Sequence, residues 1–231
     1  LINKGIDCSK LICFFQRDEA YSKSNPQLLG YNKNEIRNTD PTTYIKTVKY
    51  FIDKGYTVVR TGPKIGNPKL LVDNKYFEIS EFYEPELEIY LFKKCKFVIG
   101  SNSGALSIGW AFKKYIANSN SVTLLGNIPG FNKMNLMPKI IKNIEKDKFL
   151  NLEDIIKVKI LYNKNFQFFD NSQDLILSQA LEIENLFLYN DFSDEQKKIN
   201  KEVDKVFNRN TTLLPHYFIS ESFINKYPHF L

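Results

Sequence analysis

The segment Gly100-Ser101-Asn102-Ser103-Gly104 has the composition of a turn that can hold a phosphate group. Its glycines allow close approach of backbone N–H groups, and its side chains add two hydroxyls and an amide. The apolar run 105–114 that follows predicts a helix whose positive end faces the turn. An ordinary capped helix is an equally good interpretation, because Ser and Asn are favoured N-cap residues. The turn alone predicts either a phosphate site or a helix cap.

Three arginines could neutralise the charge of such a phosphate. Arg17 directly follows the apolar run 10–16, Arg60 lies near the end of the run 56–61, and Arg37 lies in a long polar segment. A guanidinium can make bidentate contacts with phosphate oxygens. The alternative for each arginine is an ion pair at the surface. The positions of Arg17 and Arg60 favour a diphosphate contact only if their apolar runs end at one edge of a sheet.

Carboxylates rather than histidines are the candidates for acid–base chemistry. Asp18 and Glu19 directly follow Arg17, and either could deprotonate an acceptor hydroxyl. The alternative is a structural role, in which they hold a loop or pair with the arginines. His216 and His229 lie in the C-terminal tail without an evident orienting partner, which argues against a histidine base.

The pattern of the first 150 residues predicts strands that alternate with helices. Asp40, followed by Pro41, predicts a helix start, and Gly55 predicts its end. The alternation indicates an α/β fold with a doubly wound parallel sheet, of Rossmann-like type. In such sheets ligands bind outside the carboxyl ends of the strands, so Arg17, Arg60 and the turn should share one edge. The predicted strands are 10–16, 56–61, 75–80, 96–100 and 115–118, the helices are 42–54, one that begins at Pro85, and 105–114, and a loop runs from Asn118 to Pro138.

The pattern changes after Phe149, where helices dominate. Ser172 predicts the cap of a helix over 174–189, and Ser193 with Gln196 predicts a capping box. We therefore predict a Rossmann-like domain over 1–150 and a helical annex over 151–231 that packs on it. Because the chain begins at Leu1 rather than Met, we also expect that an N-terminal domain is missing.

Composition limits the partners and the compartment. The net charge of +6 favours an anionic ligand, but the lysines are spread along the chain, so a nucleic-acid surface ranks last. The odd number of cysteines, Cys8, Cys13 and Cys95, indicates reduced thiols and a cytoplasmic protein. We find no apolar stretch long enough to span a bilayer, no Walker or Gly-x-Gly-x-x-Gly motif, and no metal-ligand spacing.

Four motifs in order carry a family resemblance, and they span the chain from about residue 10 to its C-terminus. The chain resembles a family of bacterial glycosyltransferases found with surface-polysaccharide genes, and it is distantly similar to GDP-fucose-dependent fucosyltransferases of the GT-B type. The fucosyltransferase pattern has a His before Arg17 and an Asp at position 88, where this chain has Phe15 and Glu88. The motifs are FFQRDEAY (14–21), NEIRNTDPTTYIKTVKYFIDKGYTVVRTG (34–62), LEIYLFKKCKFVIGSNSG (87–104) and SESFINKYPHF (220–230).

The resemblance implies a metal-independent transferase that needs no cofactor besides its nucleotide-sugar donor, which is GDP-linked in the fucosyltransferases. By the resemblance, the domain over 1–150 binds the nucleotide sugar, and the missing N-terminal domain is the acceptor domain. Arg17 would contact the donor diphosphate, Ser101 and Ser103 would hold phosphate, and Glu88 would lie near the nucleoside. The acceptor is a hydroxyl of a glycan or a lipid-linked glycan, which places the enzyme at the inner face of the membrane. Two alternatives stay open, namely a binding or assembly module without turnover and, last, a nucleic-acid-binding protein.

Overall fold

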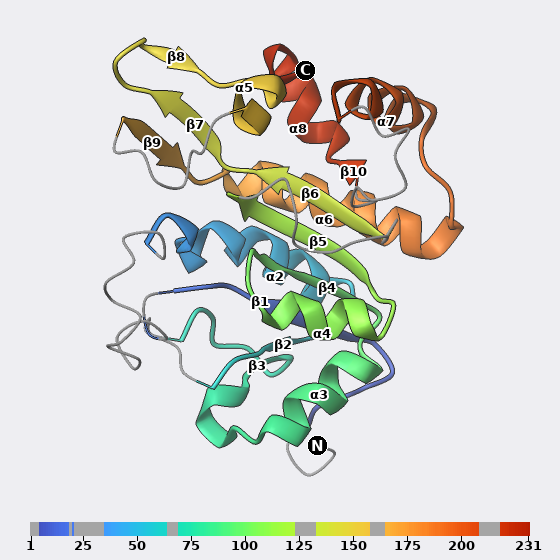
Figure 1. The fold of residues 1–231 in the computed structure, drawn as a ribbon. Helices are drawn as coiled ribbons and strands as arrows, with labels where there is room; N and C mark the ends of the chain where they lie inside the picture. Colours follow the sequence, from blue (N-terminus) through green and yellow to red (C-terminus); the bar gives the residue numbers. More distant parts are fainter. Residues whose placement is uncertain are drawn as a thin grey trace.

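The fold is built on a parallel sheet of seven strands (Figure 1). The structure is a computed structural model, and it describes residues 5–18, 20, 35–63, 69–122, 133–157, 165–207 and 218–231. The strand order is β10-β6-β5-β4-β1-β2-β3, and every neighbouring pair is parallel. The strands are β1 (Leu11–Phe15), β2 (Thr57–Arg60), β3 (Tyr76–Glu78), β4 (Phe97–Ser101), β5 (Tyr115–Ser121), β6 (Met134–Pro138) and β10 (Phe218–Ile219).

Helices cover both faces of this sheet, as the alternation of side chains along β1 shows. Leu11 and Cys13 lie in the hydrophobic core beneath α3 and α4, whereas Ile12 and Phe14 lie in the core beneath α2 and α6. Burial of successive residues on opposite faces is expected of a strand inside a doubly wound sheet. The elements of these layers are η3 (Glu35–Arg37), η4 (Pro41–Tyr44), α2 (Ile45–Asp53), η5 (Ile79–Phe82), α3 (Pro85–Lys94), α4 (Ala105–Ala111) and α6 (Gln173–Tyr189).

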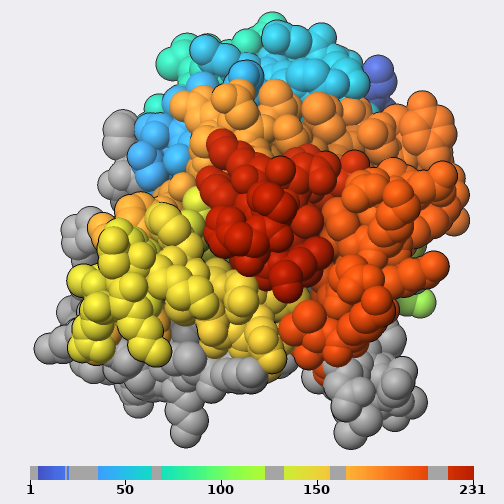
Figure 2. Space-filling model, turned by 90° about the horizontal axis from the view of Figure 1, so that it is seen from above, coloured from blue at the N-terminus to red at the C-terminus, as the bar shows by residue number. Residues whose placement is uncertain are grey.

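A second, smaller sheet and four helical elements complete the C-terminal part. The small sheet is antiparallel, in the order β8-β7-β9. Figure 2 shows residues 218–231, in red, seated between the yellow segment of β7 and α5 and the orange α7. These elements are β7 (Ile140–Asn143), β8 (Lys148–Phe149), β9 (Phe166–Phe169), α5 (Leu152–Lys157), α7 (Asp194–Phe207), α8 (Glu221–Lys226) and η7 (Pro228–Phe230).

The structure confirms the α/β class, the parallel sheet and several predicted element ends. The Asp40 side chain accepts a hydrogen bond from the Thr42 N–H, with Pro41 in the first turn. Gly55 has a φ of +86°, the left-handed conformation that favours glycine after a helix. The Ser172 side chain caps α6 through the Leu175 N–H. Local capping chemistry therefore located these ends correctly.

The C-terminal half differs from the prediction in two respects. The segment predicted as a loop up to Pro138 contains β6 and an extension of β5 to Ser121. The residues predicted as a helical annex include β9 and β10, and α6 packs against the main sheet and α2. The reason is that β10 has only two residues and β6 contains Asn and Pro, so neither gives a strand pattern in sequence.

Candidate functional site

The carboxyl ends of β1 and β4 form the point where the strand order reverses. The six strands from β1 to β6 lie in the order 3-2-1-4-5-6, as in doubly wound dinucleotide-binding folds. The chain leaves β1 toward α2 on one face and leaves β4 toward α4 on the other face. Ligands of open α/β sheets bind at this point, because the two loops diverge there. Arg17 and the turn after β4 both lie at this reversal of the strand order.

Hydrogen bonds fix the backbone at the end of β1. The Arg17 N–H donates to the Ser101 hydroxyl at 2.8 Å, and the Arg17 carbonyl accepts from the Thr39 N–H at 3.0 Å. The buried Gln16 amide donates to the carbonyls of both Arg17 and Thr39. The segment before η4 is thus tied to β1 and, through Arg17, to β4. Gln16 and Thr39 are site residues that the sequence analysis missed.

The side chain of Arg37 contacts the turn directly. One terminal nitrogen of its guanidinium lies 3.4 Å from the Asn102 carbonyl and 3.3 Å from the Asn102 side-chain oxygen. The Asn102 amide in turn donates to the Ser121 hydroxyl of β5 at 3.0 Å. Partial burial lowers the pKa of Arg37, and no acidic residue in the described part of the chain forms an ion pair with it. A bound anion would stabilise the charged guanidinium of Arg37 and so oppose the effect of burial.

The turn itself presents fewer groups to a ligand than its sequence suggests. Ser101 is fully buried and accepts the Arg17 bond, and the Ser103 hydroxyl accepts from the Ala105 N–H at 3.2 Å. A Cβ on Gly100 would lie 2.3 Å from the Phe15 carbonyl oxygen, so this glycine permits β1 and β4 to approach. Gly104 is exposed, and a Cβ there would meet nothing. Ser103 and Gly104 are therefore the exposed part of the turn.

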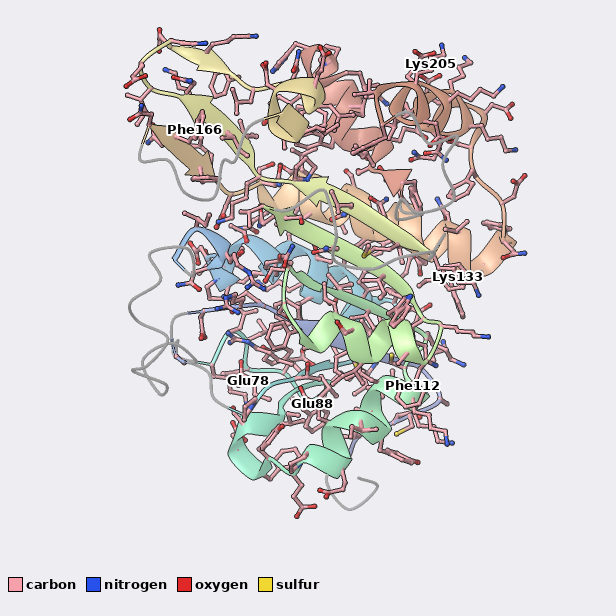
Figure 3. The ribbon with its side chains drawn as sticks, viewed as in Figure 1. Glu78, Glu88, Phe112, Lys133, Phe166 and Lys205 are labelled. Atoms are coloured by element: carbon pink, nitrogen blue, oxygen red, sulfur yellow. The ribbon has the colours of Figure 1, made fainter. Side chains whose placement is uncertain are left out.

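Arg60 is enclosed by protein groups, and its predicted donor contact stays a prediction. Its side chain is fully buried, and its guanidinium donates to Glu78 at 3.2 Å and to the Gln16 side-chain oxygen at 2.7 Å (Glu78 is labelled in Figure 3). The Asp18 carboxylate lies 3.8 Å from the same guanidinium. A buried charge requires such partners. Here Glu78 and Gln16 already accept hydrogen bonds from both terminal nitrogens of the guanidinium. Arg60 supports the site indirectly, because it orients Gln16.

Of the two proposed base residues, the structure describes Asp18 but not Glu19. Asp18 lies at the predicted edge but is buried, with 8% of its surface exposed, and its carboxylate accepts the Ala20 N–H at 2.9 Å. Glu19 lies outside the described residues, as does His216. His229 lies in η7 next to Phe149, away from the ends of β1 and β4.

Glu88 lies at the neighbouring strand end, where β2 leads into Thr61 and Gly62. It stands on the first turn of α3, is buried, and accepts a hydrogen bond from the Tyr83 hydroxyl at 3.0 Å (Figure 3). Burial raises the pKa of Glu88, and hydrogen bonds from Tyr83, Thr61 and Gly62 oppose this effect. Its role near a nucleoside remains a prediction.

We expect Glu88→Gln to raise the melting temperature at pH 7. A carboxyl group whose folded-state pKa lies above its unfolded value of 4.5 contributes stability that is fully present below 4.5. This contribution is lost as the pH rises through the folded pKa, whereas glutamine resembles the protonated acid at every pH. The gain in the melting temperature should thus shrink as the pH falls toward 4. A gain that persists unchanged at pH 4 would rule out burial of the charge as its cause.

The comparisons with known proteins add no family. The chain has no match among protein-family models, curated proteins or solved structures. Within the described residues, His, Cys, Asp and Glu side chains form no group of three that could hold a metal ion. The described helices also include none with the length and apolar character to cross a membrane. The case for a function therefore rests on the edge where β1 and β4 meet.

Proposed function

We propose that this chain binds a nucleotide sugar at the carboxyl ends of β1 and β4 and transfers its sugar to a glycan hydroxyl. One observation carries the proposal. The Arg37 guanidinium contacts Asn102 in the turn after β4, and the backbone N–H of Arg17 donates to Ser101, so both residues are anchored where the strand order reverses. The resemblance to GT-B glycosyltransferases supports the same function.

The chemistry assigned to this edge is stabilisation of a departing nucleoside diphosphate. When the bond between the sugar carbon and the diphosphate oxygen breaks, negative charge grows on that oxygen. The sugar carbon bonds to the acceptor oxygen, whose proton passes to a general base, with Asp18 and Glu19 as the candidates. Preorganised cations and N–H donors lower the energy of this charge. Because α4 has only seven residues, we assign most of this effect to Arg37 and Arg17 rather than to the helix. The proposal needs no metal ion.

Arg37→Ala is expected to weaken nucleoside diphosphate binding by about ten- to a hundredfold, as for a hydrogen-bonded charge. Calorimetric titration with GDP, UDP and CMP, and with their sugars, measures this. Arg37→Lys keeps the charge but loses the planar fork, so it should recover only part of the affinity. Lys148→Ala removes an exposed cation in the small sheet and serves as the control. Equal affinity of Arg37→Ala and the wild type would contradict the proposal.

A second candidate, binding without transfer, is favoured by the burial of Asp18. Its carboxylate is engaged by Ala20 and lies close to Arg60, so it is not presented to an acceptor hydroxyl. Release of free sugar from the donor, followed over time, separates the two functions. Hydrolysis by the wild type that is lost in Asp18→Asn or Glu19→Gln supports the transferase. Tight donor binding with no hydrolysis or transfer supports the binding module.

A further inference from the structure

The acidic residues of this chain are unevenly distributed, although the lysines are spread throughout. Residues 89–144 contain eight lysines and no Asp, Glu or Arg, so this segment accounts for more than the whole net charge of +6. The segment runs from α3 through β4, α4 and β5 to β7. Five of its lysines lie within 93–114, around the C-terminal ends of α3 and α4.

The fold brings these lysines to the amino ends of the strands. α3 and α4 pack side by side, since a Cβ on Gly109 would lie 3.6 Å from the Phe92 ring. The Lys114 ammonium donates to the Cys95 carbonyl at 2.8 Å, which joins the end of α3 to the start of β5. In Figure 3, Phe112 marks this edge, and Glu78 lies toward the opposite edge, where the candidate site is.

Exposed aromatic side chains accompany the lysines. Trp110 on α4 is 37% exposed and Tyr90 on α3 is 43% exposed. The Lys94 ammonium lies 5.7 Å from the centre of the Tyr90 ring. We call the surface formed by Tyr90, Lys93, Lys94, Trp110 and Lys113 the basic edge.

Structural roles account for only part of the basic edge. A cation in the last turn of a helix stabilises the helix dipole, which explains Lys93 or Lys94. It does not explain Lys113, which follows α4, or the exposed Trp110. The exposed lysines Lys93, Lys94 and Lys113 form no ion pair with any residue in the described part of the chain, so their charges are open to solvent.

We propose that the basic edge docks on an anionic lipid bilayer. Clusters of lysine attract acidic headgroups, and Trp and Tyr rings favour the boundary between headgroups and acyl chains. A nucleic acid fits less well, because phosphate recognition favours arginine and this segment has none. The strands separate the two edges, so docking leaves the ends of β1 and β4 open to a donor. The proposal does not depend on the identity of that donor.

Trp110 is the only tryptophan of the chain, so its fluorescence reports on this surface alone. With vesicles of phosphatidylcholine and phosphatidylglycerol, we expect its emission to shift to the blue and lipids brominated on their acyl chains to quench it. Vesicles of phosphatidylcholine alone should produce neither effect. Each headgroup-facing lysine contributes to the affinity, so Lys93→Ala/Lys94→Ala/Lys113→Ala should weaken vesicle binding by about a hundredfold.

A matched variant separates this surface from a general effect of charge. Lys198→Ala/Lys201→Ala/Lys205→Ala removes the same charge from the exposed side of α7 and should reduce vesicle binding by less than about threefold in 0.15 M salt. Equal losses in the two triple variants would overturn the proposal. So would binding with no change in Trp110 emission, absence of vesicle binding, or tighter binding of a single-stranded oligonucleotide at the same salt concentration.

Discussion

Replacement of Arg60 with methionine is expected to lower the free energy of unfolding by about 3–5 kcal/mol, the usual cost when a buried ion pair loses one partner. The guanidinium is fully buried between Glu78 and Gln16, with Asp18 at 3.8 Å. Its removal leaves carboxylates in the protein interior without their counter-charge. Urea unfolding followed by circular dichroism measures the loss.

Two further variants test whether uncompensated charge is the cause. Glu78→Gln in the Arg60→Met background removes one buried charge and keeps an oxygen for the Tyr76 hydroxyl, which lies 2.7 Å from Glu78. Part of the stability should therefore return. Lys148→Met breaks the exposed pair with Asp154 and should change stability by less than about 1 kcal/mol. A small effect of Arg60→Met, similar to that of Lys148→Met, would contradict the buried network.

Gly100→Ala is expected to destabilise the fold by about 3 kcal/mol or more, at the upper end of overpacking effects. The new Cβ would lie 2.3 Å from the Phe15 carbonyl oxygen and 3.3 Å from the Leu106 side chain. Backbone atoms of β1 cannot move aside without loss of the pairing between β1 and β4, in which Phe15 lies opposite Gly100. Since Arg17 and Ser101 adjoin this contact, ligand binding should fall as well.

Gly104→Ala is the matched control in the same turn. Gly104 has a φ of −61°, which any residue adopts, and a Cβ there meets no atom within 4 Å. We expect a change in the free energy of unfolding within about 1 kcal/mol, in the stabilising direction if the unfolded chain loses entropy. If both glycine variants are equally unstable, the turn is under a constraint other than the approach of β1 and β4.

The N-terminal half of the fold was predictable because its local signals are strong. Asp40, Pro41 and Gly55 delimit the first helix region, and buried apolar runs mark β1 and β4. The adjacency of Arg17 and the turn then followed from the rule that parallel strands share a carboxyl edge. These inferences needed only short-range patterns and one general property of α/β sheets.

The roles of individual side chains at the edge were not predictable, because they depend on contacts distant in sequence. Arg60 closely resembles Arg17 in its local pattern, yet Glu78 on the next strand and Gln16 directly after β1 enclose it. Ser101 has the composition of a phosphate ligand, but it bonds to Arg17 instead. Strand β10 pairs with β6 over two residues, which is too short for any pattern.

The most direct test of the central claim is to map the backbone amide shifts of the isotopically labelled chain during titration with GDP, UDP and CMP. The account predicts that at least one nucleotide shifts the amides of Arg17, Arg37 and Ser103, while those of Lys93 and Lys113 at the opposite edge remain unchanged. Shifts confined to the amino ends of the strands, or no saturable shift with any nucleotide, would contradict a nucleotide site where β1 and β4 meet.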